Sequence, residues 1–227
     1  MNYFLTELIP YAQEILPLLM KGLGLTLYIG IASFLGALVL GAFLAVIYTI
    51  KITLINRIIR VYVSFFRGTP LLMQVFLFYY GLPMLFEPLL GIPKIEALIF
   101  CMALNGSAYV CESVRGAIES IDRGQYEASI AFGMSHFQAM RRIIFPQASV
   151  AVVPTLTGVF LDLLKMSSIG MTIGVQELTG RAQLITATYY KAFETYFIAI
   201  IIYWILSIIF ERVQKRIEIR ISAAYQK

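Results

Sequence analysis

Stretches without a charged residue divide the chain into five strongly apolar segments. These charge-free runs cover residues 22–50, 68–86, 97–111, 143–161 and 195–210. Such runs are typical of membrane-spanning helices, because only a helix satisfies its own backbone hydrogen bonds in lipid. Extending each run to its apolar neighbours, we predict spans at about residues 20–50, 60–86, 95–116, 146–169 and 193–215.

The composition agrees with a membrane protein and argues against several other classes. Of the 227 residues, 59% are hydrophobic and only 14% are charged, whereas soluble domains carry about 25% charged residues. This shortage of charge disfavours an ordinary soluble enzyme, a disordered regulator and a nucleic-acid-binding protein. With no internal repeat, we predict a single all-α transmembrane domain over residues 1–227 with five transmembrane helices.

Basic residues predict the orientation of these helices. Thirteen of the 18 Lys and Arg residues fall after the first span, after the third span, or in the tail. Lys and Arg gather on the cytoplasmic side of membrane proteins. We therefore expect the N-terminus outside and the C-terminus in the cytoplasm. The thirteen are Lys51, Arg57, Arg60, Arg67, Arg115, Arg123, Arg141, Arg142, Arg212, Lys215, Arg216, Arg220 and Lys227.

Cysteine and histidine are too scarce for a metal centre. The chain has two cysteines, Cys101 and Cys111, and one histidine, His136, without metal-ligand spacing. An intramembrane enzyme is also disfavoured, because Glu112 is the sole candidate base within the cysteines' span. We predict no metal site and no catalytic residue.

The long loop after the third span carries the signals of two short helices. Asp122 followed by Gln125, and Ser135 followed by Gln138, each fit an N-cap with its capping-box partner. Gly133 lies between them, where the end of a helix favours a positive φ. The residues predict helix, glycine turn, helix. Such an amphipathic helix suits docking into another protein, lying on the membrane, or packing on its own spans.

The same loop resembles the EAA loop of ABC importer permeases. The family pattern is Glu-Ala-Ala, three residues, Gly, nine residues, Ile-x-Leu-Pro. Here Ser129 and Phe145 are conservative departures from it. The pattern falls on Glu127, Ala128, Ser129, Gly133, Ile143, Phe145 and Pro146. Further motifs, which are similar to the polar amino-acid subfamily, begin at Gly24, Phe66, Tyr79, Ala108, Arg115, Gly124 and Val175.

The resemblance implies a type I ABC importer permease fold in a bacterial cytoplasmic (inner) membrane. It implies that residues at about 119–145 form a coupling loop, in which Glu127, Ala128 and Gly133 contact a cytoplasmic ATPase. Two ATPase subunits, a second permease copy or a sister permease, and an extracytoplasmic solute-binding protein are the implied partners. The chain has no Gly-Lys dipeptide and so no phosphate-binding loop. ATP and Mg are therefore expected in the ATPase, with no cofactor in this chain.

Two charged residues, Asp162 and Lys165, fall within or beside the fourth span. An ionisable group in a span costs roughly 2.5–3.5 kcal/mol and needs a reason. At a spacing of three residues the pair can face each other on one helix. Either the pair lines the solute pathway and binds a charged group of an amino acid, or it is a mutually neutralised pair. The family's Leu-Leu-Lys-Asp-Thr-Ser has Met166 here in place of its acid, which suggests that the acid has moved to Asp162.

Glu112 and Arg115 repeat this spacing near the inner end of the third span, where we favour a structural ion pair over solute binding.

Taken together, the residues and the family resemblance predict the membrane-spanning subunit of an ATP-driven importer for cystine, arginine, glutamine or a similar polar amino acid. The run beginning at Glu119 is most similar to cystine permeases. The alternatives are an ion-coupled secondary transporter, which usually has inverted repeats, and an oligomeric channel, which has no need of an acid-bearing cytoplasmic helix.

Overall fold

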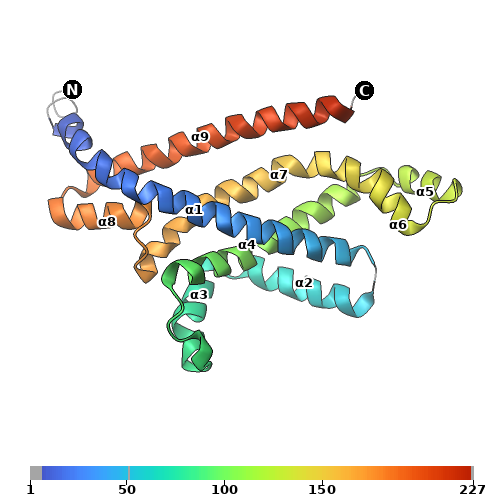
Figure 1. Cartoon of the computed structure of the whole chain (residues 1–227), viewed down its shortest axis with the longest axis horizontal. Coiled ribbons are helices and arrows are strands. Elements are labelled where there is room, and N and C mark those ends of the chain that lie inside the picture. Colours follow the sequence, from blue (N-terminus) through green and yellow to red (C-terminus); the bar gives the residue numbers. More distant parts are fainter. Residues whose placement is uncertain (1–6, 51, 226–227) are drawn as a thin grey trace. The chain divides into compact units, whose positions relative to one another are not determined.

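The computed structural model describes residues 7–50 and 52–225, with side chains as far as residue 219. Lys51, the side chain of Arg220, and Lys227, which contributed to the predicted orientation, lie outside the described residues. The described residues contain helices and no strands (Figure 1), which confirms the predicted all-α class. The α-helices are α1 Ile9–Tyr48, α2 Thr53–Gly68, α3 Leu71–Phe76, α4 Lys94–Glu119, α5 Arg123–Ala131, α6 His136–Ala139, α7 Phe145–Met166, α8 Leu178–Tyr189 and α9 Ala192–Tyr225.

Four helical stretches of the described chain are long and apolar enough to cross a membrane. They are Ile9–Tyr48, Lys94–Glu119, His136–Ile173 and Ala192–Ile219. A fifth candidate span is the pair Thr53–Gly68 and Leu71–Met84, which passes the same test only as a pair and is bent at its break. The structure therefore supports four or five spans, and the side on which each terminus lies remains a prediction.

The break between α2 and α3 has a local cause. Pro70 has no backbone N–H and is extended (φ −63°, ψ 131°) immediately before α3. A proline also disfavours helical backbone at the residue before it, here Thr69. The Gln74 amide bonds back to the Thr69 carbonyl at 3.1 Å and to its hydroxyl at 2.8 Å. The predicted second span is thus interrupted rather than one straight helix.

The first helix begins earlier than the sequence suggested, at Ile9 rather than near residue 20. Pro17 lies inside this helix, and the helix continues through it. The extra turns have a packing partner, since Leu8, Tyr11, Ile15 and Leu19 recur at helical spacing and are buried.

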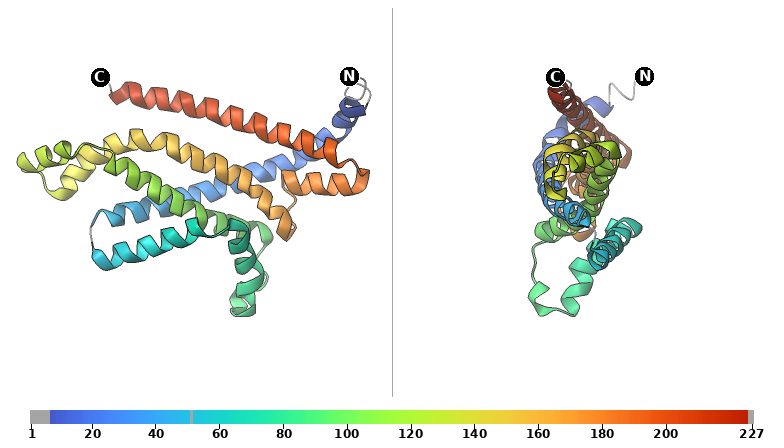
Figure 2. Two further views of the ribbon diagram at one scale, coloured as in Figure 1. Left: turned by 180° about the vertical axis from the view of Figure 1, so that it is seen from behind. Right: turned by 90° about the vertical axis from the view of Figure 1, so that its right-hand side faces the viewer.

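The chain divides into two compact units that share the four longest α-helices. Unit 1 comprises Met1–Leu35, Thr69–Ala103 and Phe160–Phe210, and unit 2 comprises Gly36–Gly68, Leu104–Val159 and Glu211–Lys227. In unit 1, the start of α1 packs on α8 and on the first turns of α9 (Figure 2). This core is formed by Leu8, Tyr11, Ile15, Leu19, Leu178, Ala182, Ile185, Ile198 and Ala199.

Unit 2 has a core in which α1, α2 and α4 meet. It joins Ala45 of α1, Ile59 and Val63 of α2, and Ala108 and Cys111 of α4. The helices approach closely, because a Cβ at Gly41 would lie 2.5 Å from the Ser107 carbonyl oxygen. Small residues at such crossings are typical of packed membrane helices.

Candidate functional site

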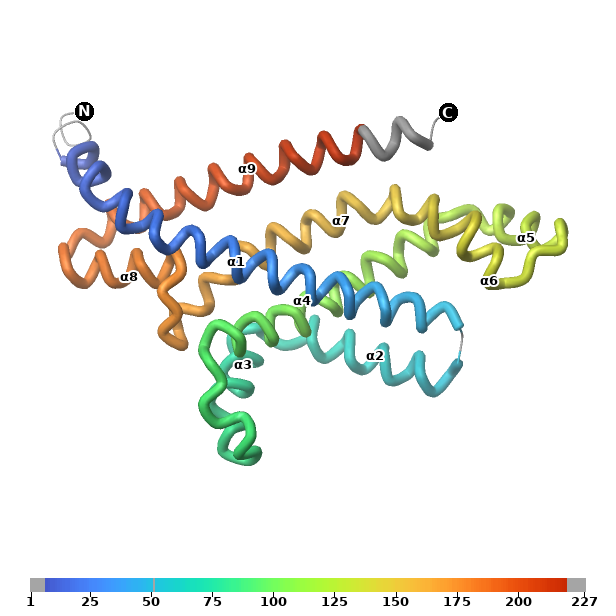
Figure 3. Tube along the Cα trace, in the orientation of Figure 1, coloured from blue at the N-terminus to red at the C-terminus, as the bar shows by residue number. Residues whose placement is uncertain are grey.

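The loop after α4 folds as the predicted helix, glycine turn and helix (Figure 3). Helix α5 is capped at its start by Asp122, whose carboxylate accepts a hydrogen bond from the Gly124 N–H at 2.7 Å. The helix ends at Phe132, and Gly133 follows with φ +82°. This left-handed conformation is one that glycine adopts without the steric cost of a Cβ. The predicted N-cap at Asp122 and the glycine turn are confirmed by these contacts, although the bond to the Asp122 side chain comes from Gly124 and not from Gln125.

Helix α6 is fixed at its start by a complete capping box. The Ser135 hydroxyl accepts from the Gln138 N–H at 3.3 Å, and the Gln138 side chain accepts from the Ser135 N–H at 2.9 Å. Tyr126 of α5 and His136 of α6 are joined by a 3.2 Å hydrogen bond between the phenol oxygen and Nδ1. The two short helices are therefore held together by side chains as well as by the turn.

The three residues expected to contact an ATPase lie on the surface of this loop. Glu127 and Ala128 are exposed on α5, and Gly133 is exposed at the turn. Nearby, Phe132 is 87% exposed and Phe137 is 68% exposed. Large exposed apolar side chains next to a charged residue are typical of a surface that binds another protein.

A cavity of about 790 Å³ lies beside Glu127 within unit 2. Its walls come from the ends of α1 and α4, the start of α2, and the loop that contains α5 and α6. Charged and aromatic side chains line it, including Arg115, Glu119, Tyr126, Glu127 and His136.

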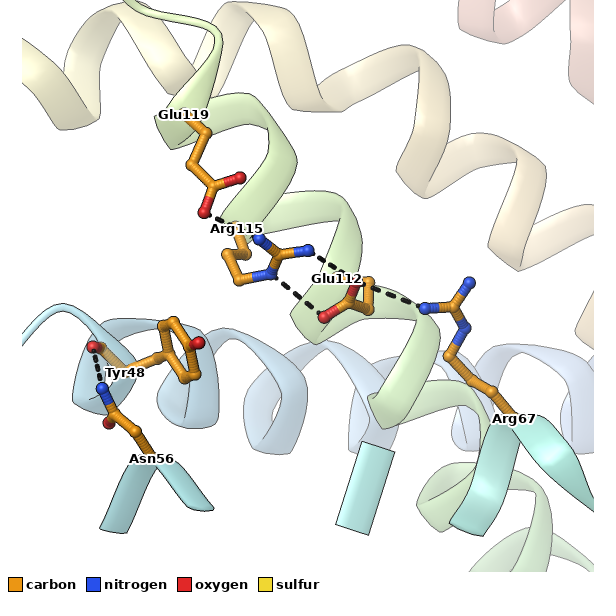
Figure 4. A network of polar contacts seen from close by, with 6 residues as sticks. All are labelled: Tyr48, Asn56, Arg67, Glu112, Arg115 and Glu119. Atoms are coloured by element: carbon orange, nitrogen blue, oxygen red, sulfur yellow. Dashed lines mark hydrogen bonds and ion pairs between the residues drawn. The ribbon is translucent and has the colours of Figure 1, made fainter. Parts of the chain in front are cut away.

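Glu112 and Arg115, the pair predicted at the inner end of the third span, are brought together in a larger network (Figure 4). The Arg115 guanidinium donates to both Glu112 oxygens at 3.1 and 2.8 Å, and to Glu119 at 2.7 Å. Arg67 of α2 lies 3.2 Å from the same Glu112 carboxylate. The network ties α2 to the part of α4 that leads into the loop containing α5 and α6. The sequence could have indicated Glu119 as a partner of Arg115, because the two are four residues apart on one helix. It gives no sign that Arg67 on α2 pairs with Glu112.

Asp162 and Lys165 also form an ion pair, on α7 in unit 1. The Lys165 Nζ lies 3.0 Å from Asp162 Oδ1, and the two side chains are 53% and 62% exposed. Neither side chain is covered by the rest of the subunit. In a membrane helix, such an exposed pair must face lipid, a water-filled path or another subunit.

Glu177 is a buried acid that sequence reasoning did not single out. Its carboxylate is inaccessible to solvent and accepts hydrogen bonds from the Gly180 N–H at 2.8 Å, the Tyr203 hydroxyl at 2.9 Å and the Thr26 hydroxyl at 3.2 Å. It thereby caps α8 and joins α8 to α1 and α9. Two features of the sequence point to Glu177. It lies in the motif that begins at Val175, and it precedes Gly180 by three residues at the start of a helical stretch. Among the described residues, no group of three or more His, Cys, Asp or Glu side chains could hold a metal ion.

Residues 37–223 match a family described as the binding-protein-dependent transport system inner membrane component. A similar protein is the probable amino-acid ABC transporter permease protein PatM of Vibrio harveyi, which is 40% identical over 95% of this chain and 96% of PatM. The L-cystine transport system permease protein TcyL of Bacillus subtilis is 36% identical, over 87% of this chain and 84% of TcyL.

Two solved structures have a similar fold. The crystal structure of an amino acid ABC transporter with histidines contains a chain that is 36% identical, with a TM-score of 0.85 over 91% of this chain and 95% of that one. An inward-facing MetNI methionine ABC transporter gives a TM-score of 0.77 at 20% identity, over 92% of this chain and 98% of that one. The second likeness concerns the fold alone.

Proposed function

The chain belongs to the inner membrane components of binding-protein-dependent transport systems and is an amino-acid ABC transporter permease subunit, and we propose that it forms the translocation pathway for a polar amino acid. Membership of this family implies an ATPase subunit and a solute-binding protein as partners in general. The proposal adds three points to this: the residues that contact the ATPase, the path of the solute through the membrane, and the chemical class of the solute.

The observation that carries the proposal is the exposed surface of α5. Glu127, Ala128 and Ala131 share one face of this helix by their spacing, and all three are exposed. Small residues beside a single acid leave a slim helix that fits a groove, and the apolar Phe132 and Phe137 flank it. We assign the contact with the ATPase to Glu127 and Ala128, and the shape of the turn to Gly133.

In the proposed assembly, two copies of the permease, or one copy and a sister permease, pair with two ATPase subunits. ATP and Mg bind to the ATPases, and closure of these subunits moves the helices through α5. The solute-binding protein docks on the opposite side, where the N-terminus lies, and the C-terminus lies in the bacterial cytoplasm. This orientation follows from the distribution of Lys and Arg.

We propose that Asp162, with Lys165, lines the solute pathway at the contact between two permease subunits. Exposure of both side chains on the isolated subunit supports this, because a pathway between subunits leaves its walls uncovered in one of them. Asp162 and Met166 lie four residues apart, and therefore one turn apart on the same side of α7. An acid moved from the family's position to Asp162 would still reach the same part of the path.

The proposed solute is cystine, arginine, glutamine or a similar amino acid. The named transport systems of the relatives support this range, since they include L-cystine for TcyL and glutamine for GlnP of Escherichia coli, which is 33% identical. An ion-coupled secondary transporter and an oligomeric channel are not favoured by the family.

The test is to purify the tagged chain from native membranes and identify the proteins that accompany it. Wild type should retain an ATPase, and Glu127→Lys should lose it, because reversal of the charge on α5 opposes docking. Glu211→Lys reverses an exposed acid on α9 and serves as the matched control. Uptake into vesicles should require ATP inside, and an ion gradient alone should not support it. Loss of the ATPase in both variants would contradict the assigned contact.

A further inference from the structure

Helix α2 carries two arginines without an acidic partner. In the part of the chain that the structure describes, Arg67 and Arg115 are paired with acids, but no ion pair involves Arg57 or Arg60. Both are exposed, and they are three residues apart on the helix. Like charges at this spacing destabilise a helix by a small amount unless an anion lies between them. The pair therefore presents two uncompensated positive charges next to each other on α2.

A row of exposed apolar side chains runs beside these arginines. Leu54, Ile58, Val61 and Phe65 follow one another at spacings of four, three and four residues, and they are 49% to 67% exposed. A shallow groove of about 490 Å³ lies along this row. Its walls are Arg57, Ile58, Val61, Tyr62, Phe65 and Phe66, so Arg57 is the one charged residue in an apolar groove.

On the other side of Arg60 lies a second cavity, of about 360 Å³, in the angle between α1, α2 and α4. Three arginines, Arg60, Arg67 and Arg115, and one acid, Glu112, line it. Because Glu112 is already bound by Arg67 and Arg115, the charge of Arg60 is not compensated there. The cavity is positive overall.

We propose that α2 binds an anionic phospholipid, with its phosphate between Arg57 and Arg60 and an acyl chain in the groove along Ile58, Val61 and Phe65. Basic pockets between membrane helices bind acidic lipid headgroups, and an amphipathic helix places its apolar face at the acyl boundary. Inorganic phosphate would satisfy the arginines but would leave the groove uncovered. A docked protein would cover the groove, but it would also need an acid to match the two arginines.

The lipid would lie beside the coupling machinery. Arg115 and Tyr48 line both the positive cavity and the larger cavity next to Glu127. Of the residues proposed to bind the lipid, Arg60 lines the positive cavity, so the headgroup would reach the network between α2 and α4 through Arg60. The inference rests on the membrane location of α2 and not on the solute or the ATPase contact, so its failure would leave the proposed function intact.

The test uses the full chain, purified with its accompanying subunits and placed in phosphatidylcholine nanodiscs. Fluorescent phosphatidylglycerol is the probe, and its dissociation constant is measured by energy transfer from a donor dye attached to Leu54→Cys, an exposed position on α2. Wild type should bind phosphatidylglycerol more tightly than a phosphatidylcholine probe with the same chains. Each basic side chain at an anionic lipid surface contributes about fivefold in binding, so Arg57→Gln with Arg60→Gln should weaken it roughly 30-fold.

The matched control is Arg212→Gln with Arg216→Gln, which removes the same charge from α9, because these two residues do not line the groove along Ile58, Val61 and Phe65. Its affinity for phosphatidylglycerol should equal that of wild type. Equal weakening in both double variants would overturn the proposal in favour of non-specific attraction. Displacement of the probe by inorganic phosphate as well as by unlabelled phosphatidylglycerol would assign the site to a free anion.

Two further readouts decide the question if the double variant does not fold. The preference of wild type for phosphatidylglycerol over phosphatidylcholine needs no variant, and its absence would end the proposal. A photoreactive cross-linker on Ile58→Cys, activated in native membranes, should label lipid. A cross-link to a second copy or to another protein would show that a protein covers this face.

Discussion

The hydroxyl of Tyr203 donates a hydrogen bond of 2.9 Å to the fully buried carboxylate of Glu177. With the Gly180 N–H and the Thr26 hydroxyl, it gives the acid three donors from three segments of the chain. A buried carboxylate is tolerated only when its oxygens are hydrogen-bonded. Glu177 therefore holds α1, α8 and α9 together through one set of polar contacts.

Replacement of Tyr203 by Phe should destabilise unit 1. The variant removes the hydrogen bond to the Glu177 carboxylate, and a bond to such a group is worth about 1.5–3 kcal/mol. It also removes the 3.1 Å hydrogen bond between the Tyr203 and Thr179 hydroxyls, and it adds no atom. The thermal unfolding midpoint in mild detergent should fall clearly. Tyr196→Phe on the same helix is the control. Because the Tyr196 side chain is exposed, loss of its hydroxyl should leave the unfolding midpoint unchanged. Equal midpoints for the two variants would show that the Glu177 contact contributes little.

Two glycines of α1 should respond in opposite ways to alanine. A Cβ at Gly41 would lie 2.5 Å from the Ser107 carbonyl oxygen and 2.6 Å from Val110, whereas a Cβ at Gly24 would meet nothing within 4 Å. Gly41→Ala should cost about 1–3 kcal/mol of stability through overpacking. Gly24→Ala should be neutral or stabilise by up to about 1 kcal/mol through helix propensity. The unfolding midpoints of the two variants, measured side by side, check the crossing of α1 and α4.

The turn at Gly133 tests whether backbone shape matters for coupling. Nothing lies within 4 Å of a Cβ at this position, so the effect of a substitution comes from its positive φ alone. Gly133→Ala should cost roughly 1–2 kcal/mol locally, and Gly133→Asn less, because Asn tolerates left-handed backbone better. Hydrogen exchange of the α5 and α6 amides should rise more for Ala than for Asn. The amount of ATPase retained should fall more for Gly133→Ala than for Gly133→Asn, and a larger loss for Asn would argue against this explanation.

The ion pair between Arg67 and Glu112 should be measurable but small. Their side chains are 44% and 29% exposed, so solvent screens the attraction. A double-mutant cycle with Arg67→Gln and Glu112→Gln should give a coupling free energy of about 0.5–1 kcal/mol. Glu112→Gln alone should cost more than Arg67→Gln, since it also removes the partner of Arg115. Glu96→Gln, an exposed acid on the same helix, supplies the baseline, and a coupling of zero would reduce the network to a surface arrangement.

The elements that the sequence predicted correctly depend on neighbours within a few residues. The caps at Asp122 and Ser135 and the turn at Gly133 are local contacts, so their residue types and spacing were sufficient.

The features that could not be predicted depend on segments far apart in the chain. Glu177 has its hydroxyl donors at Thr26 and Tyr203. In the sequence alone, a charged residue indicates the end of a span, and nothing shows that this one is buried and hydrogen-bonded. Arg67 has its partner 45 residues away, at Glu112. Proline is a helix breaker, so the residue type at position 70 agrees with the interruption there. The apolar pattern of the sequence is nevertheless the same for a bent pair of helices and for one straight span.

Asp162 offers the sharpest distinction between a solute contact and a neutralising ion pair. If it binds the solute, Asp162→Ala should raise the half-saturating solute concentration for uptake by about 10- to 100-fold, the loss expected for a hydrogen bond to a charged group. Removing Lys165 as well should not restore uptake. If the two residues only neutralise each other, the double variant should instead recover, because no unpaired charge remains on α7. Returning an acid to the neighbouring turn, by combining Asp162→Ala with Met166→Asp, should restore uptake under the solute-binding role, and failure of that variant, when folded, would count against a moved acid.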